Sequence, residues 1–377
     1  MVPILFLITG LNTGGAEMQV YQVIKTLRAQ KPIYRPIVVS LLPPGQVGQK
    51  LEQENIPVYS LEMERGRPSM MAIVRLNQII KKENIQLIHS HMYHANLLGR
   101  LIKFLHPDIK LVNTIHNIHI GGRNRERMLR LTNRLADSVT IISETARTYF
   151  VESGTVRPEK LLFLPNGVNT KLYQEKPGAG EAIKRELQLP DTAFTWLAVG
   201  RFDEQKNYPN LLQAFQRVVQ KEPDTVLLIA GVGPLLDQTK KLAADLGLSS
   251  RVRFLGYRTD IPDMMSAADA YVMSSDWEGM PLVLQEASSV GLPIVCTDVG
   301  GNKEVVIEGE TGFIVQPKSS FALAEGMLRL LRMDPESRTQ MGEAGKDYMQ
   351  STFEMDRVAE KWHALYKQVL EPQIQIV

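Results

Sequence analysis

Two kinds of hydrophobic pattern alternate along the chain. Short apolar runs rich in Val, Ile and Leu, typical of buried strands, are followed by longer segments whose apolar residues recur at the spacing of a helix face. In the first half the apolar runs are PILFLIT, YRPIVVSLL, IQLIHS, KLVNTIH, SVTIIS and KLLFLPNGV. Strands that alternate with helices predict parallel sheets built from right-handed strand–helix–strand units.

The same alternation starts again in the second half. It follows a segment at 166–181 that we interpret as a loop, and its apolar runs are FTWLAVG, TVLLIAG, VRFLG, DAYVMSS, LPIVCTD and TGFIVQP. From residue 321 to the end the pattern is helical. We therefore predict an α/β fold with two Rossmann-like, doubly wound parallel-sheet domains, over residues 1–168 and 169–357.

Composition agrees with a globular protein of two domains. The chain has 377 residues, of which 44% are apolar and 22% charged. Its single cysteine, Cys296, excludes an intramolecular disulfide, and its apolar neighbours predict a core position. The first residues lack the basic region of a signal peptide, and no apolar stretch reaches the roughly 20 residues that span a bilayer. We expect a cytoplasmic protein.

Charge is unevenly distributed along the chain. Residues 1–170 carry 21 Lys and Arg against 12 Asp and Glu, whereas residues 171–377 carry 22 against 29. Either the basic half faces an anionic partner, or the two halves attract each other. Basic and apolar residues mix at 65–82 and 121–134. These segments are candidates for peripheral contact with an anionic membrane, on its cytoplasmic side, or are solvated helix surfaces.

In parallel sheets, ligands bind beyond the carboxyl ends of the strands. The first strand ends in TGLNTGGAE, where Gly14 and Gly15 stand at the start of a helix. Exposed N–H groups there can hold a phosphate. The segment matches neither the GxGxxG fingerprint nor a P-loop, so the glycines alone are a weak signal.

Two cations follow the strand FTWLAVG. Arg201 and Lys206 flank a single turn in the segment RFDEQKN. A planar guanidinium and a compact ammonium together suit a diphosphate. The alternative is that both are solvated cations, although positive charge near a helix N-terminus is mildly unfavourable.

Two carboxylates follow the strand DAYVMSS. Glu278 lies in the loop, and Glu286 lies inside a helix that begins near Pro281. Eight helical residues span about 12 Å, which exceeds the separation of a glycosidase acid–base pair. The two acids suit separate hydroxyls of one long polyol, with the free N–H groups of Leu282 and Val283 facing an anion between them.

These segments together carry a resemblance. TGG near the N-terminus, VGRFDEQKN and EGMPLVLQEASSVGLPIV resemble the retaining family 4 glycosyltransferases, also called glycosyl transferases group 1. The resemblance implies the glycosyltransferase B (GT-B) fold, in which two Rossmann-like domains face a cleft and a C-terminal helix, here about 358–377, packs back on the first domain. It also implies sugar transfer from a nucleotide-diphosphate sugar to an acceptor with retention of anomeric configuration.

The resemblance also assigns roles by position. The residues implied for catalysis are His116, Glu278, Arg201 and Lys206. The donor would contact Gly14, Gly15, Arg201, Lys206, Gly231, Tyr257, Arg258, Glu278, Met280, Leu282, Val283 and Glu286. Within this set the two cations bind the diphosphate, Glu286 the ribose and Glu278 the sugar, while the backbone around Tyr257 lines the base pocket. His91 and Asn117 would lie on the acceptor side.

Two positions depart from the family pattern. Many members have an aromatic–Gly pair where this chain has Met280-Pro281. Because Pro281 has no N–H, amides further along the helix must contact the phosphate. The linker contains Asn169 where an acid is frequent, so a charged role for that position is in doubt.

When the bond between the sugar and the diphosphate breaks, negative charge develops on the leaving group. Enzymes of another fold neutralise it with a metal held by Asp-x-Asp, and this sequence contains no Asp-x-Asp. We expect Arg201, Lys206 and helix amides to serve instead, without a metal or other cofactor. The family favours a UDP-sugar donor, and we expect a glycan or a lipid-linked anionic acceptor in cell-surface polysaccharide biosynthesis.

Other functions remain to be weighed. The histidines of HSHMYH (His89, His91, His94) and HNIH (His116, His119) could form the metal site of a hydrolase, although packing suits His89 and His94. A sugar-nucleotide epimerase or a non-enzymatic nucleotide-sugar binder could share the fold. Nucleic acid is a poor candidate, because the isoelectric point is only about 8.4 and no binding motif is present.

Overall fold

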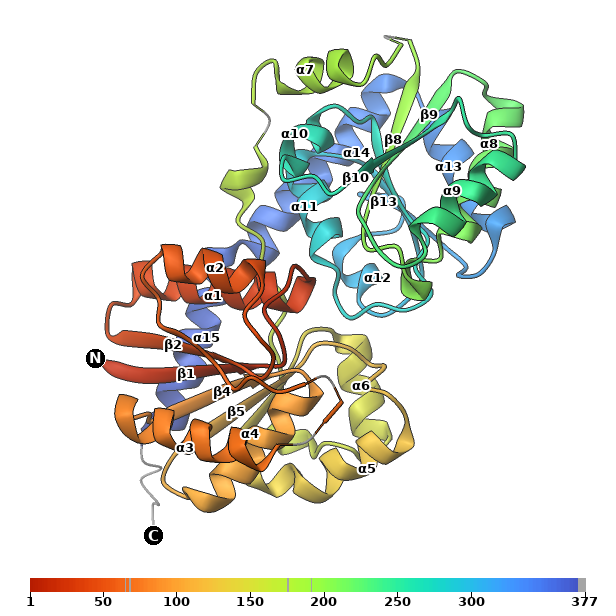
Figure 1. Cartoon of the computed structure of the whole chain (residues 1–377). Coiled ribbons are helices and arrows are strands. Elements are labelled where there is room, and N and C mark those ends of the chain that lie inside the picture. The colour runs from red at the N-terminus through yellow and green to blue at the C-terminus, as the bar shows by residue number, and fades with distance from the viewer. Residues whose placement is uncertain (65, 68, 175, 191, 372–377) are drawn as a thin grey trace. The chain divides into compact units, whose positions relative to one another are not determined.

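The computed structural model describes residues 1–371 except 65, 68, 175 and 191. The chain divides into two compact units (Figure 1). The N-terminal unit comprises Met1–Gly167 and Met355–Val377, and the C-terminal unit comprises Val168–Glu354. Each unit is an α/β structure around a parallel sheet, as the alternating pattern predicts.

The N-terminal sheet has seven parallel strands in the order β3-β2-β1-β4-β5-β6-β7. The strands are β1 (Val2–Ile8), β2 (Tyr34–Ser40), β3 (Val58–Ser60), β4 (Leu87–His91), β5 (Lys110–Ile115), β6 (Ser138–Ile141) and β7 (Leu161–Phe163). Successive strands are added to one side of β1 and then, from β4 on, to its other side. The direction of winding therefore reverses between β1 and β4, which makes this pair the topological switch point of the sheet.

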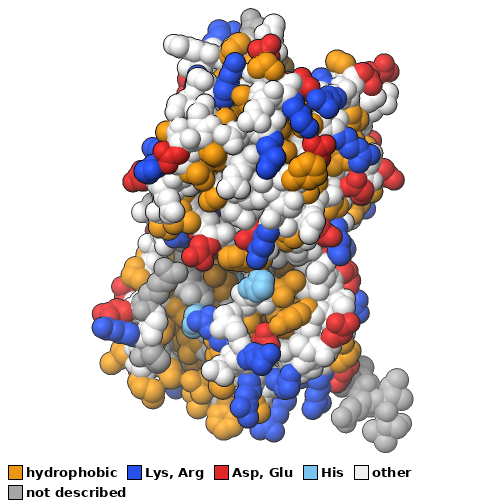
Figure 2. Space-filling model, turned by 90° about the vertical axis from the view of Figure 1, so that its right-hand side faces the viewer, with side chains coloured by type: hydrophobic (Ala, Val, Ile, Leu, Met, Phe, Trp, Pro, Cys, Tyr) orange, Lys and Arg blue, Asp and Glu red, His pale blue; other side chains and the backbone are white. Residues whose placement is uncertain are grey.

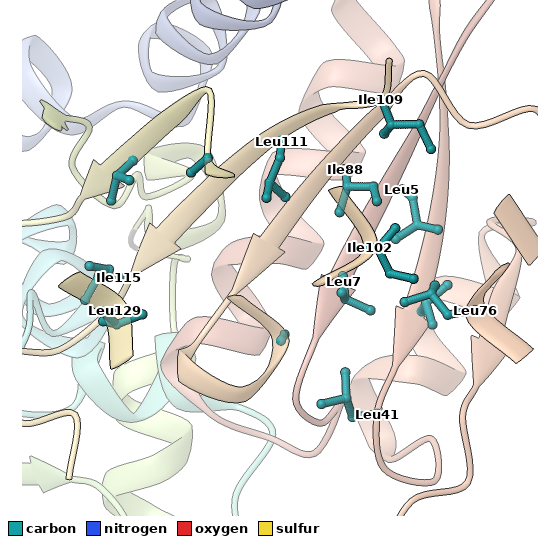
Figure 3. Close-up of a cluster of buried hydrophobic side chains, with 14 of the residues drawn as sticks. Leu5, Leu7, Leu41, Leu76, Ile88, Ile102, Ile109, Leu111, Ile115 and Leu129 are labelled. Atoms are coloured by element: carbon teal, nitrogen blue, oxygen red, sulfur yellow. The ribbon is translucent and has the colours of Figure 1, made fainter. Parts of the chain in front are cut away.

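Helices cover both faces of this sheet, and a separate hydrophobic cluster lies on each face. One face is covered by α1 (Gly15–Gln30), α2 (Gln46–Gln53) and α15 (Met355–Leu370). The other is covered by α3 (Met70–Glu83), α4 (Tyr93–Leu105), α5 (Arg123–Thr132) and α6 (Glu144–Glu152). Figure 3 shows the second cluster, in which Leu5, Ile88 and Leu111 of neighbouring strands pack with Leu76, Ile102 and Leu129 of the helices.

The C-terminal helix α15 is part of the N-terminal unit, although it lies nearly 200 residues further along the chain than β7. Val358, Trp362 and Tyr366 are buried against β1, β2 and α1. Gly167 fits against Met355, because a Cβ there would lie 2.8 Å from the Met355 sulfur. The helix thus completes one of the two cores of this unit.

The C-terminal sheet has six parallel strands in the order β10-β9-β8-β11-β12-β13. They are β8 (Phe194–Val199), β9 (Thr225–Ala230), β10 (Val252–Gly256), β11 (Ala270–Met273), β12 (Ile294–Thr297) and β13 (Gly312–Val315). The helices are α7 (Ala179–Glu186), α8 (Tyr208–Lys221), α9 (Leu236–Asp245), α10 (Ile261–Ser266), α11 (Leu282–Val290), α12 (Asn302–Val305), α13 (Ser320–Leu331) and α14 (Pro335–Tyr348). The switch point lies between β8 and β11.

One local expectation was wrong. The segment 166–181 contains a 3₁₀ helix at Thr170–Tyr173 and the start of α7, not only a loop. A single turn of this kind is too short to establish a period. The described residues of the last third are helical, as predicted, and they divide into α13, α14, a π-helix at Met349–Phe353 and α15. The Asp334 side chain caps the start of α14 by accepting from Ser337 N.

Cys296 is fully buried on β12, as predicted. Among the helices that the structure describes, none is long and apolar enough to cross a membrane.

Candidate active site

The sequence-predicted cations and carboxylates follow the two strands that flank the switch point of the C-terminal sheet. Arg201 and Lys206 follow β8, and Glu278 follows β11. Strands β8 and β11 are hydrogen-bonded neighbours. Parallel neighbours end at the same edge of a sheet, so the topology brings these two loops together.

Lys206 and Glu278 form an ion pair that the sequence analysis did not anticipate. The Lys206 Nζ donates to Glu278 Oε1 at 2.6 Å, and both side chains are largely buried. Gln205 Nε2 and Ser275 Oγ also donate to the carboxylate, at 2.9 and 2.8 Å. Each carboxylate oxygen can accept about two hydrogen bonds, so Glu278 keeps capacity for a further donor such as a hydroxyl.

Arg201 is placed differently from Lys206. Its side chain is 66% exposed and its guanidinium Nε lies 3.8 Å from the Asp203 carboxylate. At that distance the interaction is a loose surface pairing, which leaves the planar donor fork accessible to an anion. The turn between the two cations ends in Asn207, whose side chain accepts from Asn210 N and begins α8.

Glu286 lies inside α11, as predicted, and meets a residue that the sequence analysis overlooked. The Tyr173 hydroxyl, in the 3₁₀ helix of 170–173, hydrogen-bonds to the Glu286 carboxylate. The pKa of Glu286 is raised, because the effect of burial is larger than the opposing effect of the hydrogen bond from Tyr173. An acceptor held in this way is suited to a hydroxyl pair such as that of a ribose.

The N-terminus of α11 separates the two carboxylates. Leu282 and Val283 are its first two residues, and no side chain caps it, because the N-cap residue is Pro281. Its first amides therefore remain donors for an anion. Met280 is buried and its sulfur accepts from Gln285 Nε2 at 3.6 Å. Any donor contact at Met280 would therefore be made by its backbone.

Gly300 holds the Glu278 loop in place. Its φ is +54°, and a Cβ there would lie 2.1 Å from the Glu278 carbonyl oxygen. The neighbouring Gly301 N–H donates to Gly279 O at 2.7 Å. Only glycine permits this close approach of two backbones, so the GG pair after β12 positions the acidic loop.

The glycine and basic residues predicted near the nucleotide base have structural contacts of their own. Gly231 has a φ of +149°, and a Cβ there would lie 1.9 Å from Gly200 O, so backbone packing alone requires glycine. Arg258 forms ion pairs with Glu186 at 2.7 Å and Asp260 at 2.5 Å, which raise its pKa. Tyr257 is exposed. With the Arg258 guanidinium paired, this segment can contact a base mainly through its backbone.

In the N-terminal unit, the predicted phosphate contact is next to an acid. Gly14 is the N-cap of α1 and Gly15 its first residue, without a side-chain cap. A Cβ on Gly14 would lie 2.5 Å from a carboxylate oxygen of Glu17, whose pKa is raised by burial. A phosphate at Gly15 would therefore need Glu17 to move or to be protonated, which the sequence analysis did not foresee.

Two histidines meet at the end of β4 and β5. His91 Nδ1 and His116 Nε2 are 3.0 Å apart, so one ring donates to the other. His91 Nε2 and His116 Nδ1 are buried without a hydrogen-bond partner. Burial lowers both pKa values, that of His116 to about 4, so both rings are neutral at pH 7. A ligand hydroxyl could complete either unsatisfied nitrogen.

The neighbouring polar residues have separate roles. His89 is a core residue, as predicted, bonded to Tyr366 Oη and Thr114 Oγ1 at 2.7 Å each. His94 is not in the core: it is exposed on the first turn of α4, where its ring contacts the Tyr93 ring with centroids 5.2 Å apart. Asn117 Oδ1 accepts a hydrogen bond from His119 N at 3.0 Å. The side-chain NH₂ group of Asn117 can still donate a hydrogen bond to a bound substrate. In the described part of the chain, no three His, Cys, Asp or Glu side chains are arranged to hold a metal.

Switch-point cations beside carboxylates, on one of two parallel-sheet units, suit an enzyme that binds a nucleoside diphosphate. The comparisons with known proteins agree. The model of Glycosyltransferase Family 4 matches residues 13–172, and that of Glycosyl transferases group 1 matches residues 180–348. The chain belongs to the glycosyl transferases group 1 family, and it is a glycosyltransferase with the GT-B fold.

Three similar proteins illustrate the family. UDP-Gal:alpha-D-GlcNAc-diphosphoundecaprenol alpha-1,3-galactosyltransferase of Escherichia coli is 27% identical over 69% of this chain and 70% of its own. GDP-mannose-dependent alpha-(1-6)-phosphatidylinositol monomannoside mannosyltransferase of Mycobacterium tuberculosis is 29% identical over 62% of each chain. The crystal structure of Anabaena HepE with UDP and glucose has a TM-score of 0.87 at 23% identity, over 98% of this chain and 100% of that one.

Proposed function

We propose that this glycosyltransferase moves a sugar from a UDP-sugar to a glycan or lipid-linked acceptor, with retention of anomeric configuration, in cell-surface polysaccharide biosynthesis. The observation that carries the proposal is the arrangement around β8 and β11. An exposed Arg201, the Lys206–Glu278 pair and the uncapped N-terminus of α11 all belong to the two loops at the switch point and the helix that follows. This combination supplies cationic and N–H donors for a diphosphate, with hydroxyl acceptors beside them.

The leaving group sets the chemical demand. When the glycosyl–phosphate bond breaks, a nucleoside diphosphate accumulates negative charge. In the proposal, Arg201, Lys206 and the amides of Leu282 and Val283 stabilise that charge without a metal. Glu278 compensates the charge of Lys206 in its largely buried position, at a distance of 2.6 Å.

Retention follows from a route without an enzyme nucleophile. The acceptor hydroxyl attacks the face from which the diphosphate leaves, and the departing phosphate takes the hydroxyl proton. Neutral His116 is a hydrogen-bond partner for the donor sugar in this proposal, not a general base, because its pKa of about 4 leaves its basicity low.

The acceptor is inferred from the relatives. The names of the Escherichia coli and Mycobacterium tuberculosis relatives describe acceptors that combine a lipid with a phosphate group. We propose an acceptor of this lipid-linked class, reached by a peripheral position on the inner face of the cell membrane. Their names differ in the donor, UDP-Gal against GDP-mannose, so the nucleotide is the first point to test.

The experiment is a donor screen on the purified protein. Thermal shifts with UDP, GDP, ADP and their sugars should show stabilisation by uridine ligands first, because a ligand that binds only the folded state raises Tm by mass action. Turnover of the selected donor should survive EDTA, and NMR of the product should show the donor's anomeric configuration. Loss of turnover in EDTA with recovery in Mg²⁺ would contradict the metal-free part, and an inverted product would contradict retention.

A further inference from the structure

The helices α3, α4 and α5 carry an unusual share of exposed apolar side chains. Met70 is 78% exposed, Phe104 68% and Leu131 64%. Of the sixteen strongly exposed large apolar side chains in the described part of the chain, half lie on these three helices: Met70, Met71, Val74, Leu101, Phe104, Leu105, Met128 and Leu131. We call the exposed side of these three adjacent helices the α3–α5 surface. Scattered exposed apolar residues are ordinary, but a concentration on adjacent helices marks an interaction site.

Direct contacts hold the three helices together. His106 Nε2 and Asn77 Oδ1 join α4 to α3 at 2.7 Å. Arg100, buried in α4, donates from Nη1 to Leu129 O of α5 at 2.7 Å. The Arg125 guanidinium lies 4.9 Å from the Tyr93 ring centre. The apolar side chains are therefore presented on a preformed surface and not on a loose segment.

Positive charge accompanies the apolar side chains. Residues 70–135 carry eleven Lys and Arg against three Asp and Glu, which accounts for most of the basic excess of the first half. Arg127, Arg130 and Arg134 are exposed next to Met128 and Leu131. Two of the three acids are already bonded, Glu83 to Arg35 and Glu126 to the Tyr149 hydroxyl. Figure 2 shows hydrophobic and Lys and Arg side chains gathered at the lower end of the N-terminal unit.

We propose that the α3–α5 surface docks on an anionic lipid bilayer. Phe104, Leu105 and Leu131 would enter the boundary between headgroups and acyl chains, and the arginines of α5 would contact lipid phosphates. Apolar tips beside guanidinium groups match this interface, which is apolar within and anionic at its surface. A second copy of this chain is a poorer occupant, because its own excess of positive charge would face the first.

The inference deepens the proposed function and rests on it for its biological purpose, since a lipid-linked acceptor is presented at a bilayer. It also gives the basic segments 65–82 and 121–134 of the sequence a common surface, apart from residues 65 and 68, which lie outside the described part. The C-terminal end of α4, with Leu101, Phe104 and Leu105, supplies the apolar centre that the sequence analysis did not single out.

Flotation with lipid vesicles tests the proposal without any sugar transfer. Wild-type protein should float with phosphatidylglycerol vesicles and not with phosphatidylcholine vesicles, and raised salt should weaken binding. The variant F104S/L105S should lower the partition coefficient on the order of ten-fold or more, since two large apolar side chains are lost. The variant R127E/R130E should no longer bind anionic vesicles, and its binding to neutral vesicles should not increase.

Matched controls exclude general effects. F321S removes a side chain that is 63% exposed on α13 of the C-terminal unit and should float like wild type. K240E/K241E reverses two charges on α9 and should also leave flotation unchanged. Wild-type protein that fails to float, or F104S/L105S that floats fully, would overturn the proposal. So would a wild-type dimer in light scattering that F104S/L105S converts to monomer, because a second copy would then occupy the surface.

A second measurement guards against an unfolded variant. The substitution F104W places an indole at the proposed contact while keeping a large apolar side chain. Its fluorescence should be quenched by brominated phosphatidylglycerol, and F321W should give no added quenching. Equal quenching of the two variants would contradict insertion of α4. Donor binding, measured separately by thermal shift, reports on the proposed function, so failure of one inference leaves the other testable.

Discussion

The Lys206–Glu278 pair is the most consequential residue-level feature of the C-terminal unit. The sequence analysis treated the two residues as separate contacts, one for phosphate and one for sugar. In the structure they are also partners at 2.6 Å, and Gln205 and Ser275 hold the same carboxylate. Binding and stability are therefore linked at this position, because an anion that approaches Lys206 competes with an existing partner.

A double-mutant cycle measures that link. K206A and E278A should each lower the free energy of unfolding, because each leaves a largely buried charge without its partner. The double variant K206A/E278A should be destabilised by about 1–3 kcal/mol less than the sum of the two. Urea unfolding of the four proteins gives the coupling energy. Strict additivity would show that the pair contributes nothing to the fold.

The His91–His116 pair predicts a specific dependence on pH. His116 has a pKa of about 4 in the folded chain, against roughly 6.5 when unfolded. Between these values the unfolded chain binds a proton that the folded chain does not, so stability falls as pH falls. At pH 5 the wild type should have lost about 1–2 kcal/mol more, relative to pH 7, than H116Q. Thermal scans at both pH values check this, and parallel losses in the two proteins would contradict it.

The loop after β12 positions the loop after β11 that carries Glu278. G300A should reduce sugar transfer at least ten-fold, because its Cβ would lie 2.1 Å from the Glu278 carbonyl and would displace that loop. G309A is the control, since Gly309 also has a positive φ, +77°, but a Cβ there meets nothing within 4 Å. Equally reduced sugar transfer in the two variants would show that strain at a positive φ, and not the contact with Glu278, causes the loss.

Most elements could be predicted from hydrophobic period, whereas contacts between them could not. Strands such as Phe194–Val199 and helices such as Tyr208–Lys221 were identified because their apolar residues are buried on defined faces. The three-residue strand β3 and the 3₁₀ helix 170–173 were missed because three or four residues are too few to show a repeating pattern. Tyr173, which reaches Glu286, lies in such a segment and carries no local signal.

The individual residues of the candidate site could likewise be predicted from the sequence, whereas their contacts could not. Arg201, Lys206 and Glu278 were found because unusual polar residues directly follow predicted buried strands. Their pairing depends on β8 and β11 being neighbours, which the strand order decides and the local sequence does not. Gly231 was assigned to the donor site by the family resemblance, and in the structure the close approach of Gly200 O requires a glycine there.

The two halves of the chain differ in net charge, which suggests that the two units bind different partners. Residues 1–170 hold the basic excess, and residues 70–135, which include α3, α4 and α5, account for most of it. Residues 171–377 are acidic overall, yet their switch point presents Arg201 and Lys206 for an anion. General solubility does not explain a locally cationic site on an acidic unit, and such a site favours a specific anionic ligand.

We propose that Arg201 and Lys206 stabilise the charge on the departing nucleoside diphosphate. The single-turnover rate of sugar transfer at saturating donor tests this in R201A/K206A, with K240A/K241A as the matched control. The double variant should lose at least 100-fold in rate, because electrostatic stabilisation of the transition state is removed, and the control should keep the wild-type rate. Transfer at the wild-type rate by folded R201A/K206A would contradict the proposed role of the two cations.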